Sequence, residues 1–422
     1  MRTLGLLSSV LSLSIGAITT ANASGYAINV NSTTTQGRAG AGRAVTEDIL
    51  AMYNNPAILS QMKSHYEIAI SGTGLLPNVK YNDYIATNNT GNVARNKFTG
   101  SLAVAAKIHP CVTLGLSVST PYGLAFSYPH ASTSPVANNV VESELKAVAI
   151  SPTIAFKVNP MLTLGVGVDA QWTDVRLSNY PVAALPTTYG TAKGNNWVAR
   201  GTFGVLVDAT KDIRLGASVK TRSIARLKGD YTVENPQASF GLVSGKAKAD
   251  LPLPTTLTFG GSYNLCPQWT LYADYTRTNW STVNNVTLTV PVGSSSIVGG
   301  WEDSNAFSLG ADYKFNDNWT LRGGFGFDFT PTTTQAQNGV SSRVPGIPDS
   351  NKKWLAIGGS YEIKNIKISL SYGHEFFKNA PIQQAATYTT IPGIGTVPVS
   401  RALNGQIKES VDLVSLQLNY KF

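Results

Sequence analysis

The sequence predicts an all-β protein, a 14-stranded antiparallel transmembrane β-barrel whose N-terminal segment forms a hatch (plug) containing short helices. Charged residues make up only 14% of the chain, against roughly 25% in ordinary globular domains. A short polar turn recurs along the chain, and apolar residues alternate with small polar ones between the turns. Beyond residue 23 the sequence has no run of about 18 apolar residues, so we expect no membrane-spanning helix. This combination is typical of outer-membrane barrels.

The first 23 residues have the pattern of a secretory signal peptide. Arg2 supplies a positive charge, residues 4–18 are mostly apolar, and Ala21-Asn22-Ala23 has the small residues of a cleavage site. We therefore expect export and a mature chain that begins at Ser24. The predicted organisation is a signal peptide over 1–23, a hatch inside the barrel over 24–64, and the transmembrane barrel over 65–422.

The number of strands follows from a turn that occurs six times. In each copy a polar turn is followed by an apolar residue, a Thr, Arg or Lys, and a second apolar residue. The central residues are 113, 163, 214, 270, 320 and 367, which are 50, 51, 56, 50 and 47 positions apart. Such a period also suggests a solenoid or propeller, but each interval holds two strand patterns and one long connection, as in outer-membrane barrels. Six short turns separate seven hairpins, which predicts 14 strands.

Alternation along the strands indicates a lipid-facing row and a lumen-facing row. In the last strand one face carries Val414, Leu416, Leu418, Tyr420 and Phe422, and the other carries Ser415, Gln417, Asn419 and Lys421. In residues 162–172 the even positions are apolar, while the odd positions are Gly, Thr, Asp and Gln. A soluble β-sandwich also alternates, but its second face is richer in charge. The terminal Phe422 resembles the signal read by the outer-membrane assembly machinery, an expected partner.

The two cysteines lie in different short turns. Cys111 is in the first turn and Cys266 is in the fourth, so six strands separate them around the ring. A disulfide needs Cα atoms within about 7 Å. We expect both cysteines to be free.

The sequence of residues 24–64 predicts a compact plug. It contains a glycine-rich stretch, and Thr46-Glu47-Asp48 and Asn55-Pro56 are typical helix starts. Its apolar run at 49–53 argues against a loose periplasmic tail. The glycines have the wrong order for a nucleotide-binding loop. The residues of the glycine-rich stretch that we single out are Gly37, Arg38, Gly40, Gly42 and Arg43.

Several functional classes are disfavoured. The net charge is +9, but the basic residues are scattered, so we expect no nucleic-acid partner. His374-Glu375 lacks the second histidine of a zinc-protease motif, and no Ser/His/acid set is recognisable. We expect no enzyme, no cofactor and no metal site. An aqueous porin is an alternative, although it would lack a hatch.

At this point the sequence resembles the outer-membrane long-chain fatty acid transporter (FadL) family, which includes aromatic hydrocarbon transporters. The resemblance covers essentially the whole mature chain. Its most specific part is the hatch, from Gly37-Arg38-Ala39 to Asn55-Pro56-Ala57. Pro121-Tyr122-Gly123 resembles the kinked third strand of the family. Weaker matches follow in the family's order at residues 195–197, 250–252, 267–269, 317–320 and 347–349.

The resemblance implies passive uptake of hydrophobic molecules across the outer membrane of Gram-negative bacteria. Ligand would be captured at outer loops, enter an inner apolar pocket lined by Ser24, Gly25 and Tyr26, and leave sideways at the kink after the hatch moves. Apolar residues in the predicted outer loops fit a capture surface, but they also fit loops that pack on one another to close the mouth. These residues are Val182, Leu185, Phe240, Leu242, Ile391 and Ile394.

The inner pocket departs from the family pattern. Fatty acid transporters place basic residues there, but Asn179 and Ile297 fall at two such positions, and Arg176 is a nearby substitute. An unpaired carboxylate is costly in an apolar site. Two ligand classes therefore stay open, long-chain fatty acids and aromatic hydrocarbons. We also expect contact with outer-membrane lipid and lipopolysaccharide, and a monomer.

Overall fold

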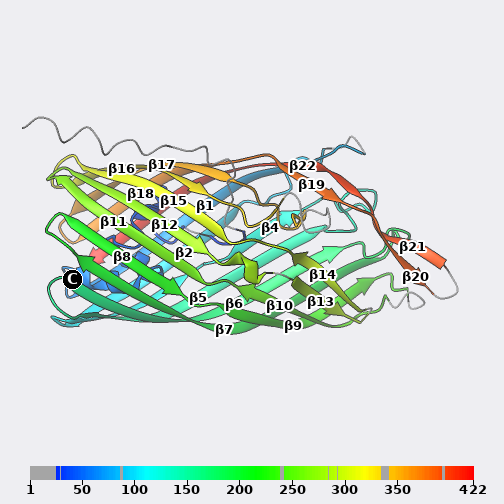
Figure 1. Cartoon of the computed structure of the whole chain (residues 1–422), viewed down its shortest axis with the longest axis horizontal. Coiled ribbons are helices and arrows are strands. Elements are labelled where there is room, and N and C mark those ends of the chain that lie inside the picture. The colour runs from blue at the N-terminus through cyan, green and yellow to red at the C-terminus, as the bar shows by residue number, and fades with distance from the viewer. Residues whose placement is uncertain are drawn as a thin grey trace, which may run out of the picture.

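The computed structural model describes residues 25–28, 30–85, 89–237, 242–283, 285–291, 293–333, 342–391 and 395–422. This part of the chain forms a long, closed antiparallel β-barrel of 14 strands, which confirms the predicted fold class (Figure 1). The ring closes between the first and last strands, with Glu67 opposite Lys421 and Asp83 opposite Gly405.

Eight of the 14 described barrel strands are continuous. They are β1 (Tyr66–Asp83), β2 (Lys97–His109), β5 (Glu142–Lys157), β6 (Leu162–Asn179), β7 (Tyr189–Asp208), β16 (Trp319–Asp328), β17 (Lys352–Ile363) and β22 (Leu403–Lys421).

The other six described barrel strands each consist of two segments. They are β3 (Val112–Ser119) with β4 (Gly123–Ser127), β8 (Ile213–Lys220) with β9 (Ser223–Glu234), β10 (Gly245–Leu253) with β11 (Thr256–Cys266), β12 (Trp269–Thr278) with β13 (Asn285–Val290), β14 (Gly293–Gly299) with β15 (Ser304–Lys314), and β18 (Ile366–Phe377) with β19 (Ala380–Gln384). A further hairpin, β20 (Thr387–Ile391) and β21 (Gly395–Ser400), projects beyond the barrel (Figure 1).

The six predicted short turns connect strands at the end of the barrel that carries the C-terminus (Figure 1). Asparagine side chains shape two of them. Asn159 Oδ1 accepts hydrogen bonds from the amides of Met161 and Leu162 at 2.8 and 2.9 Å. An asparagine that bonds its own backbone in this way favours a tight turn. The long connections lie at the opposite end.

The two faces of the wall differ as the alternation predicts. In β6, Leu164 and Val168 are 44% and 50% exposed, whereas Thr163 and Asp169 are 3% and 1% exposed. The apolar row therefore faces the membrane and the small polar row faces the lumen. Cys111 and Cys266 are free, as predicted. In the described part of the chain, no helix has the length and apolar character needed to cross a membrane.

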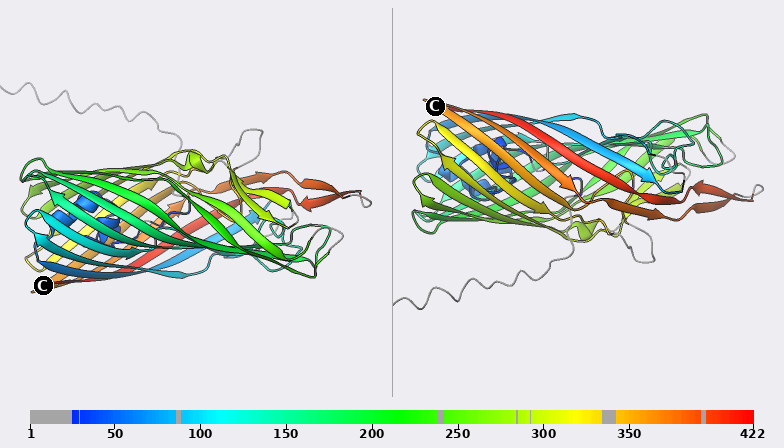
Figure 2. Two further views of the ribbon diagram at one scale, coloured as in Figure 1. Left: turned by 90° about the horizontal axis from the view of Figure 1, so that it is seen from below. Right: turned by 90° about the horizontal axis from the view of Figure 1, so that it is seen from above.

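The hatch lies inside the barrel, toward the end with the short turns (Figure 2). Ser32, Asp48 and Asn55 cap its three short helices, and each side chain accepts a hydrogen bond from a first-turn amide. The helices are α1 (Thr33–Gln36) and two 3₁₀ helices, η1 (Ile49–Tyr53) and η2 (Pro56–Gln61). A fourth short helix, η4 (Trp280–Thr282), follows β12.

Small residues on the wall make room for the hatch. The buried hatch side chains Leu50, Ile58 and Leu59 pack in one cluster with Ala103 and Ala155 of the wall. Glycines of the wall allow still closer approach. A Cβ atom at Gly310 would lie 2.8 Å from the Cβ of Arg38 in the hatch. The glycine-rich lumen face is therefore a packing surface for the hatch.

Candidate functional site

The backbone ladder of the barrel wall is interrupted in the third strand, where Thr120–Tyr122 separate β3 from β4. Pro121 has no amide hydrogen to donate, so it cannot continue a ladder. In the described ladders β2 pairs with β3 only from Leu102 onward, and β4 pairs with β5. The first residues of β2, 97–101, pair with β1 alone. An unpaired stretch of wall therefore lies beside the kink.

The N-terminal end of the hatch lies against this stretch from inside. Ala27 forms an antiparallel bridge with Tyr122. The amide of Ile28 donates to the carbonyl of Pro121 at 2.8 Å, and the amide of Gly123 donates to the carbonyl of Tyr26 at 3.2 Å. A side chain at Gly123 would collide with that of Ile28. The hatch thus pairs with the backbone at the strand break.

Aromatic rings surround the side chain of Tyr26, which is 3% exposed. Its ring centroid lies 4.7 Å from that of Trp280, 5.5 Å from Tyr122 and 5.7 Å from Trp301. Its hydroxyl donates to the carbonyl of Pro252. Burial raises the pKa of Tyr26 well above its ordinary value, so the hydroxyl stays neutral and acts as a donor.

A buried arginine connects three strand breaks. Arg200 of β7 donates to the hydroxyl of Tyr122 at 2.6 Å, to the carbonyl of Thr221 at 2.9 Å and to the carbonyl of Pro254 at 2.6 Å. Tyr122 precedes β4, Thr221 lies between β8 and β9, and Pro254 lies between β10 and β11. Breaks in a ladder leave carbonyls without strand partners, and such buried groups need donors. Arg200 supplies them.

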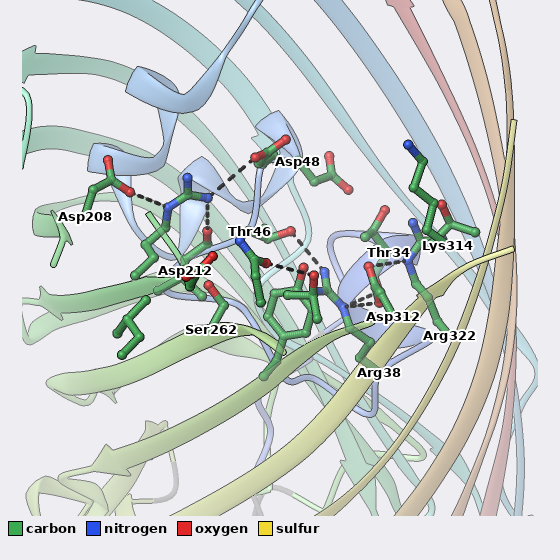
Figure 3. Close-up of a pocket in the computed structure, with 18 of the residues that line it drawn as sticks. Thr34, Arg38, Thr46, Asp48, Asp208, Asp212, Ser262, Asp312, Lys314 and Arg322 are labelled. Atoms are coloured by element: carbon green, nitrogen blue, oxygen red, sulfur yellow. Dashed lines mark hydrogen bonds and ion pairs between the residues drawn. The ribbon is translucent and has the colours of Figure 1, made fainter. Parts of the chain in front are cut away.

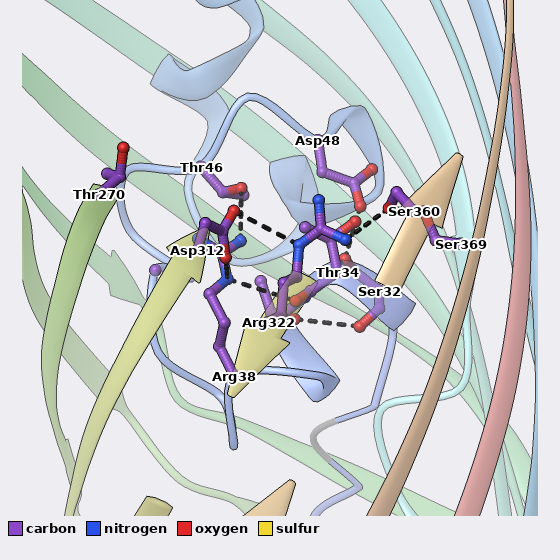
Figure 4. A network of polar contacts seen from close by, with 12 residues as sticks. Ser32, Thr34, Arg38, Thr46, Asp48, Thr270, Asp312, Arg322, Ser360 and Ser369 are labelled. Carbon is purple, nitrogen blue, oxygen red and sulfur yellow. Dashed lines mark hydrogen bonds and ion pairs between the residues drawn. The ribbon is translucent and has the colours of Figure 1, made fainter. Parts of the chain in front are cut away.

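A second arginine anchors the hatch to the wall near the short turns (Figure 4). Arg38 is fully buried, and its Nε lies 3.6 Å from a carboxylate oxygen of Asp312. Its guanidinium carbon lies 3.8 Å from the ring centroid of Tyr272. The other oxygen of Asp312 lies 3.4 Å from Nε of Arg322. One aspartate of the wall therefore pairs with a hatch arginine and a strand arginine.

Two further carboxylates bind the hatch backbone and helix caps. Asp274 of β12 accepts hydrogen bonds from the amides of Gly42 and Arg43. Asp48 accepts hydrogen bonds from Ser32 at 2.6 Å and Gln417 at 2.8 Å. Burial alone would raise the pKa of Asp48, but these two hydrogen bonds and nearby charges hold that pKa below its ordinary value.

A polar cavity of about 380 Å³ separates this end of the hatch from strands β8, β11, β12, β15 and β16 (Figure 3). Its lining includes Arg38, Asp48, Asp208, Asp212, Asp312 and Arg322. An apolar molecule moving through it would displace water from these charges, which is unfavourable. Within the described residues, no cluster of His, Cys, Asp or Glu is placed to hold a metal ion.

The lumen on the other side of the hatch is nearly filled. A cavity of about 50 Å³ is lined by Val175, Leu177, Leu227, Leu251, Val286 and Leu288. A cavity of about 80 Å³ lies beside Tyr122 and Trp280. For comparison, an engineered apolar cavity that binds benzene has a volume of about 150 Å³. In this state neither cavity admits an aromatic or long-chain ligand.

Comparison with known families agrees with this geometry. A family model described as "Outer membrane protein transport protein (OMPP1/FadL/TodX)" matches residues 14–422. The chain belongs to this family. It is therefore an outer-membrane transporter of Gram-negative bacteria, of the FadL/TodX family.

Relatives in this family are distant but match along most of their length. The long-chain fatty acid transport protein of Escherichia coli K12 is 23% identical over 87% of this chain and 91% of its own. A putative outer membrane protein of Neisseria meningitidis, NMB0088, is 25% identical over 96% of both chains.

Solved structures of the FadL/TodX family share the fold. A FadL homologue of Pseudomonas aeruginosa has a TM-score of 0.82 at 21% identity, covering 94% of this chain and all of its own. The toluene transporter TodX of Pseudomonas putida has a TM-score of 0.67 at 17% identity, covering 92% of this chain and 97% of its own.

The structure places the hatch residues resembling the FadL motifs as follows. Asn55 caps η2, and its amide donates to the carbonyls of Ala44 at 2.7 Å and Val205 at 3.2 Å. Pro56 and Ala57 form the first turn of that helix. In the glycine-rich segment, Gly40 and Gly42 have φ angles of +83° and +87°, which side-chain-bearing residues rarely adopt.

Of the three hatch residues predicted to line the inner pocket, the structure describes Gly25 and Tyr26. Gly25 lies against Trp301 and Trp280, and Tyr26 lies between the same rings. Ser24 lies outside the described residues. Gly25 and Tyr26 therefore lie at the kink, where the hatch, to which they belong, fills the lumen.

The prediction that Arg176 lines the inner pocket is wrong. Its guanidinium pairs with Glu142 at 2.8 Å, its side chain is 39% exposed, and it lines none of the lumenal cavities described above. Val175 and Leu177 on either side of it face the lumen. Alternation along β6 explains this, because Arg176 shares the even, outward row with Leu164 and Val168.

The predicted capture residues largely pack on one another. Val182 and Leu242 are 7% and 1% exposed, and they belong to one apolar cluster that Leu185 contacts. Phe240 and Ile394 lie outside the described residues, and the side chain of Ile391 is not described. In this state the described loop residues favour closure of the mouth over an open capture surface.

Sequence reasoning missed Arg200, Trp280 and Trp301. Arg200 stands in the lumenal row of β7, where a charge interrupts small polar residues, and that interruption was a usable signal. The two tryptophans come from the connections that follow β12 and β14, and they are 21 residues apart in the sequence. No local pattern indicates that they meet Tyr26.

Proposed function

We propose that this protein carries hydrophobic molecules, long-chain fatty acids or aromatic hydrocarbons, passively across the outer membrane and releases them sideways at the kink of the third strand. The observation that carries the proposal is the unpaired wall beside Thr120–Tyr122, which the hatch segment at Tyr26–Ile28 covers from inside. The names of relatives, a fatty acid transporter and a toluene transporter, support both ligand classes.

The two ends of the hatch differ in a way that supports sideways release. Near the short turns the hatch is held by a buried ion pair and by hydrogen bonds to Asp274 and Gln417, and it faces a charged cavity. At the kink it is held mainly by two backbone hydrogen bonds and packing. An exit at the kink requires displacement of a short segment, whereas an axial exit requires the buried Arg38–Asp312 ion pair and the hydrogen bonds of Asp274 and Gln417 to break.

Whether a ligand with a carboxylate can bind in the lumen depends on the positively charged side chains there. With Arg176 facing outward, the basic side chains beside the 80 Å³ cavity are Arg43 and Lys220. Lys220 is paired with Asp169 at 2.5 Å. Arg43 is 7% exposed and interacts electrostatically with the carboxylates of Asp274, Asp328 and Glu375. A carboxylate that reached this cavity would meet Arg43, so the fatty acid alternative stays compatible with the lumen.

The test is uptake by cells that lack their own transporters of this kind and express this chain. Labelled oleate and toluene should enter faster than in cells with the empty vector. Proteoliposomes containing the purified protein should not swell in sugar solutions. Free sugar permeation would indicate a general diffusion porin, and the absence of both oleate and toluene uptake would overturn the proposal. Recognition of Phe422 by the assembly machinery, contact with lipopolysaccharide, and the monomeric state stay predictions.

A further inference from the structure

The side chain of Tyr26 is enclosed by aromatic and apolar side chains inside the barrel. Its ring stacks edge-on against Trp280 and Tyr122, and Trp301 lies on a further side (ring centroids 4.7, 5.5 and 5.7 Å away). Edge-to-face arrangements at these separations are favourable for aromatic rings. Leu251, Leu253 and Val286 complete the same buried cluster. A tethered ring therefore fills an aromatic slot inside the barrel.

The slot also has a polar end. The carbonyl of Pro252 accepts the hydrogen bond of the Tyr26 hydroxyl. The indole nitrogen of Trp301, whose side chain is 2% exposed, has no hydrogen-bond partner among the described residues. If a ring without a hydroxyl group replaced Tyr26, the buried Pro252 carbonyl would lose its donor, which is destabilising. The slot therefore fits a ring that bears a hydroxyl group better than a plain hydrocarbon ring.

The site is held in shape by groups outside it. Arg200 fixes the hydroxyl of Tyr122 and the carbonyl of Pro254, two residues beyond Pro252. The 50 Å³ cavity is lined in part by Leu227, Leu251 and Val286, which belong to the same apolar cluster as Tyr26. Removal of the Tyr26 ring would therefore leave a ring-sized space in this cluster.

We propose that this slot is a binding site for neutral alkylphenols, which compete with Tyr26 for it. This inference rests on the proposed function, because the ligand would reach the slot through the lumen. The smallest matching ligand is p-cresol, which has the structure of a tyrosine side chain. Its binding displaces Tyr26, and with it the hydrogen bond from Gly123 to the Tyr26 carbonyl at the kink.

The test is calorimetric titration of the purified full mature protein in detergent with p-cresol and with toluene. In the wild type, Tyr26 competes and p-cresol binds weakly. In Tyr26→Ala the slot is empty, so the affinity for p-cresol should rise by about tenfold or more, because the competent state no longer has to be selected. The same variant should prefer p-cresol to toluene by roughly tenfold, since toluene leaves the Pro252 carbonyl unpaired.

A second variant guards against misfolding of the alanine protein. Tyr26→Phe keeps the ring and loses its hydrogen bond, so its affinity for p-cresol should lie between those of the wild type and Tyr26→Ala. Tyr66→Ala, which removes an exposed tyrosine outside this cluster, is the matched control and should bind as the wild type does. Equal p-cresol binding by all four proteins, or equal binding of p-cresol and toluene by Tyr26→Ala, would overturn the inference.

The titration and the uptake assay distinguish failure of the phenol site from failure of the proposed transport function. If oleate or toluene uptake is intact but p-cresol does not bind, the phenol site is refuted and the proposed function stands. If p-cresol binds to Tyr26→Ala while no hydrophobic molecule enters cells, the site stands and the transport proposal fails.

Discussion

The amide of Ile28 donates a hydrogen bond of 2.8 Å to the carbonyl of Pro121. Together with the bridge between Ala27 and Tyr122, this bond joins the hatch to the third barrel strand at its break. Proline breaks the ladder at this point, and the hatch replaces the missing strand partner. The hydrogen bond between Ile28 and Pro121 therefore depends on the position of the hatch N-terminus. A ligand that moves this segment also changes the wall.

A disulfide across this contact should stop uptake. Ala27 and Tyr122 are directly opposite in an antiparallel bridge, where Cα atoms are about 4.5–5.5 Å apart, within reach of a disulfide. With Cys111 and Cys266 replaced by serine, we expect Ala27→Cys/Tyr122→Cys to lose oleate uptake when oxidised and to recover it on reduction. Each single-cysteine variant controls for the lost side chain. Undiminished uptake with the bond formed would refute an exit at the kink.

Removal of the Arg38 side chain should loosen the hatch. Arg38→Ala deletes a fully buried partner of Asp312 and the contact with the Tyr272 ring. Loss of one member of a buried ion pair costs about 3–5 kcal/mol. We expect a lower unfolding midpoint in denaturant and frequent current bursts in planar bilayers. Lys314→Ala, which removes an exposed pair with Asp317, should change stability by less than about 1 kcal/mol.

Of two adjacent glycines of β16, only one should be sensitive to replacement by alanine. A Cβ atom at Gly324 would collide with the backbone of Arg38, whereas a Cβ atom at Gly323 meets nothing closer than 3.9 Å. Overpacking of this kind costs about 1–3 kcal/mol. Gly324→Ala should lower the free energy of unfolding and increase hydrogen exchange in the hatch. Gly323→Ala should leave both unchanged, and similar effects of the two variants would contradict this packing.

The cap at Asn55 should contribute measurably to the hatch. Asn55→Ala removes the acceptor for the Ala57 amide and the donor to the carbonyls of Ala44 and Val205. Loss of a helix N-cap alone costs about 1–2 kcal/mol. We expect faster proteolysis and exchange in residues 42–62, with barrel unfolding less affected. Asn54→Ala, a change next to the cap, is the control and should resemble the wild type.

Acid should release the hatch through Asp48. Because the folded-state pKa of Asp48 is below its ordinary value, the carboxylate stabilises the hatch above an unfolded pKa of about 3.9. This contribution is lost as the pH falls through the lower folded-state pKa. Bilayer leak currents should therefore rise steeply below about pH 4. Asp48→Asn should leak more at neutral pH and show a weaker acid dependence; an unchanged acid response would exclude Asp48 as the cause.

Much of the fold could be predicted because its signals are local. The turns at Asn159 and Asn316 are closed by asparagine side chains that bond their own backbone, and the number and spacing of the six turns report the number of hairpins directly. The caps Asp48 and Asn55 are likewise set by neighbours in the sequence. The outward direction of Arg176 was also present in the alternation of β6, and a prediction based on that row would have placed it correctly.

The sequence by itself determined the strand number, the two faces of the wall, the free cysteines and the presence of short helices before the barrel. These depend on contacts within a turn, a helix start or a strand. The tertiary structure alone decided that Tyr26 meets Trp280 and Trp301, and that Arg200 joins three strand breaks. Those contacts depend on ring closure and on the depth of the hatch in the lumen, which no local pattern encodes.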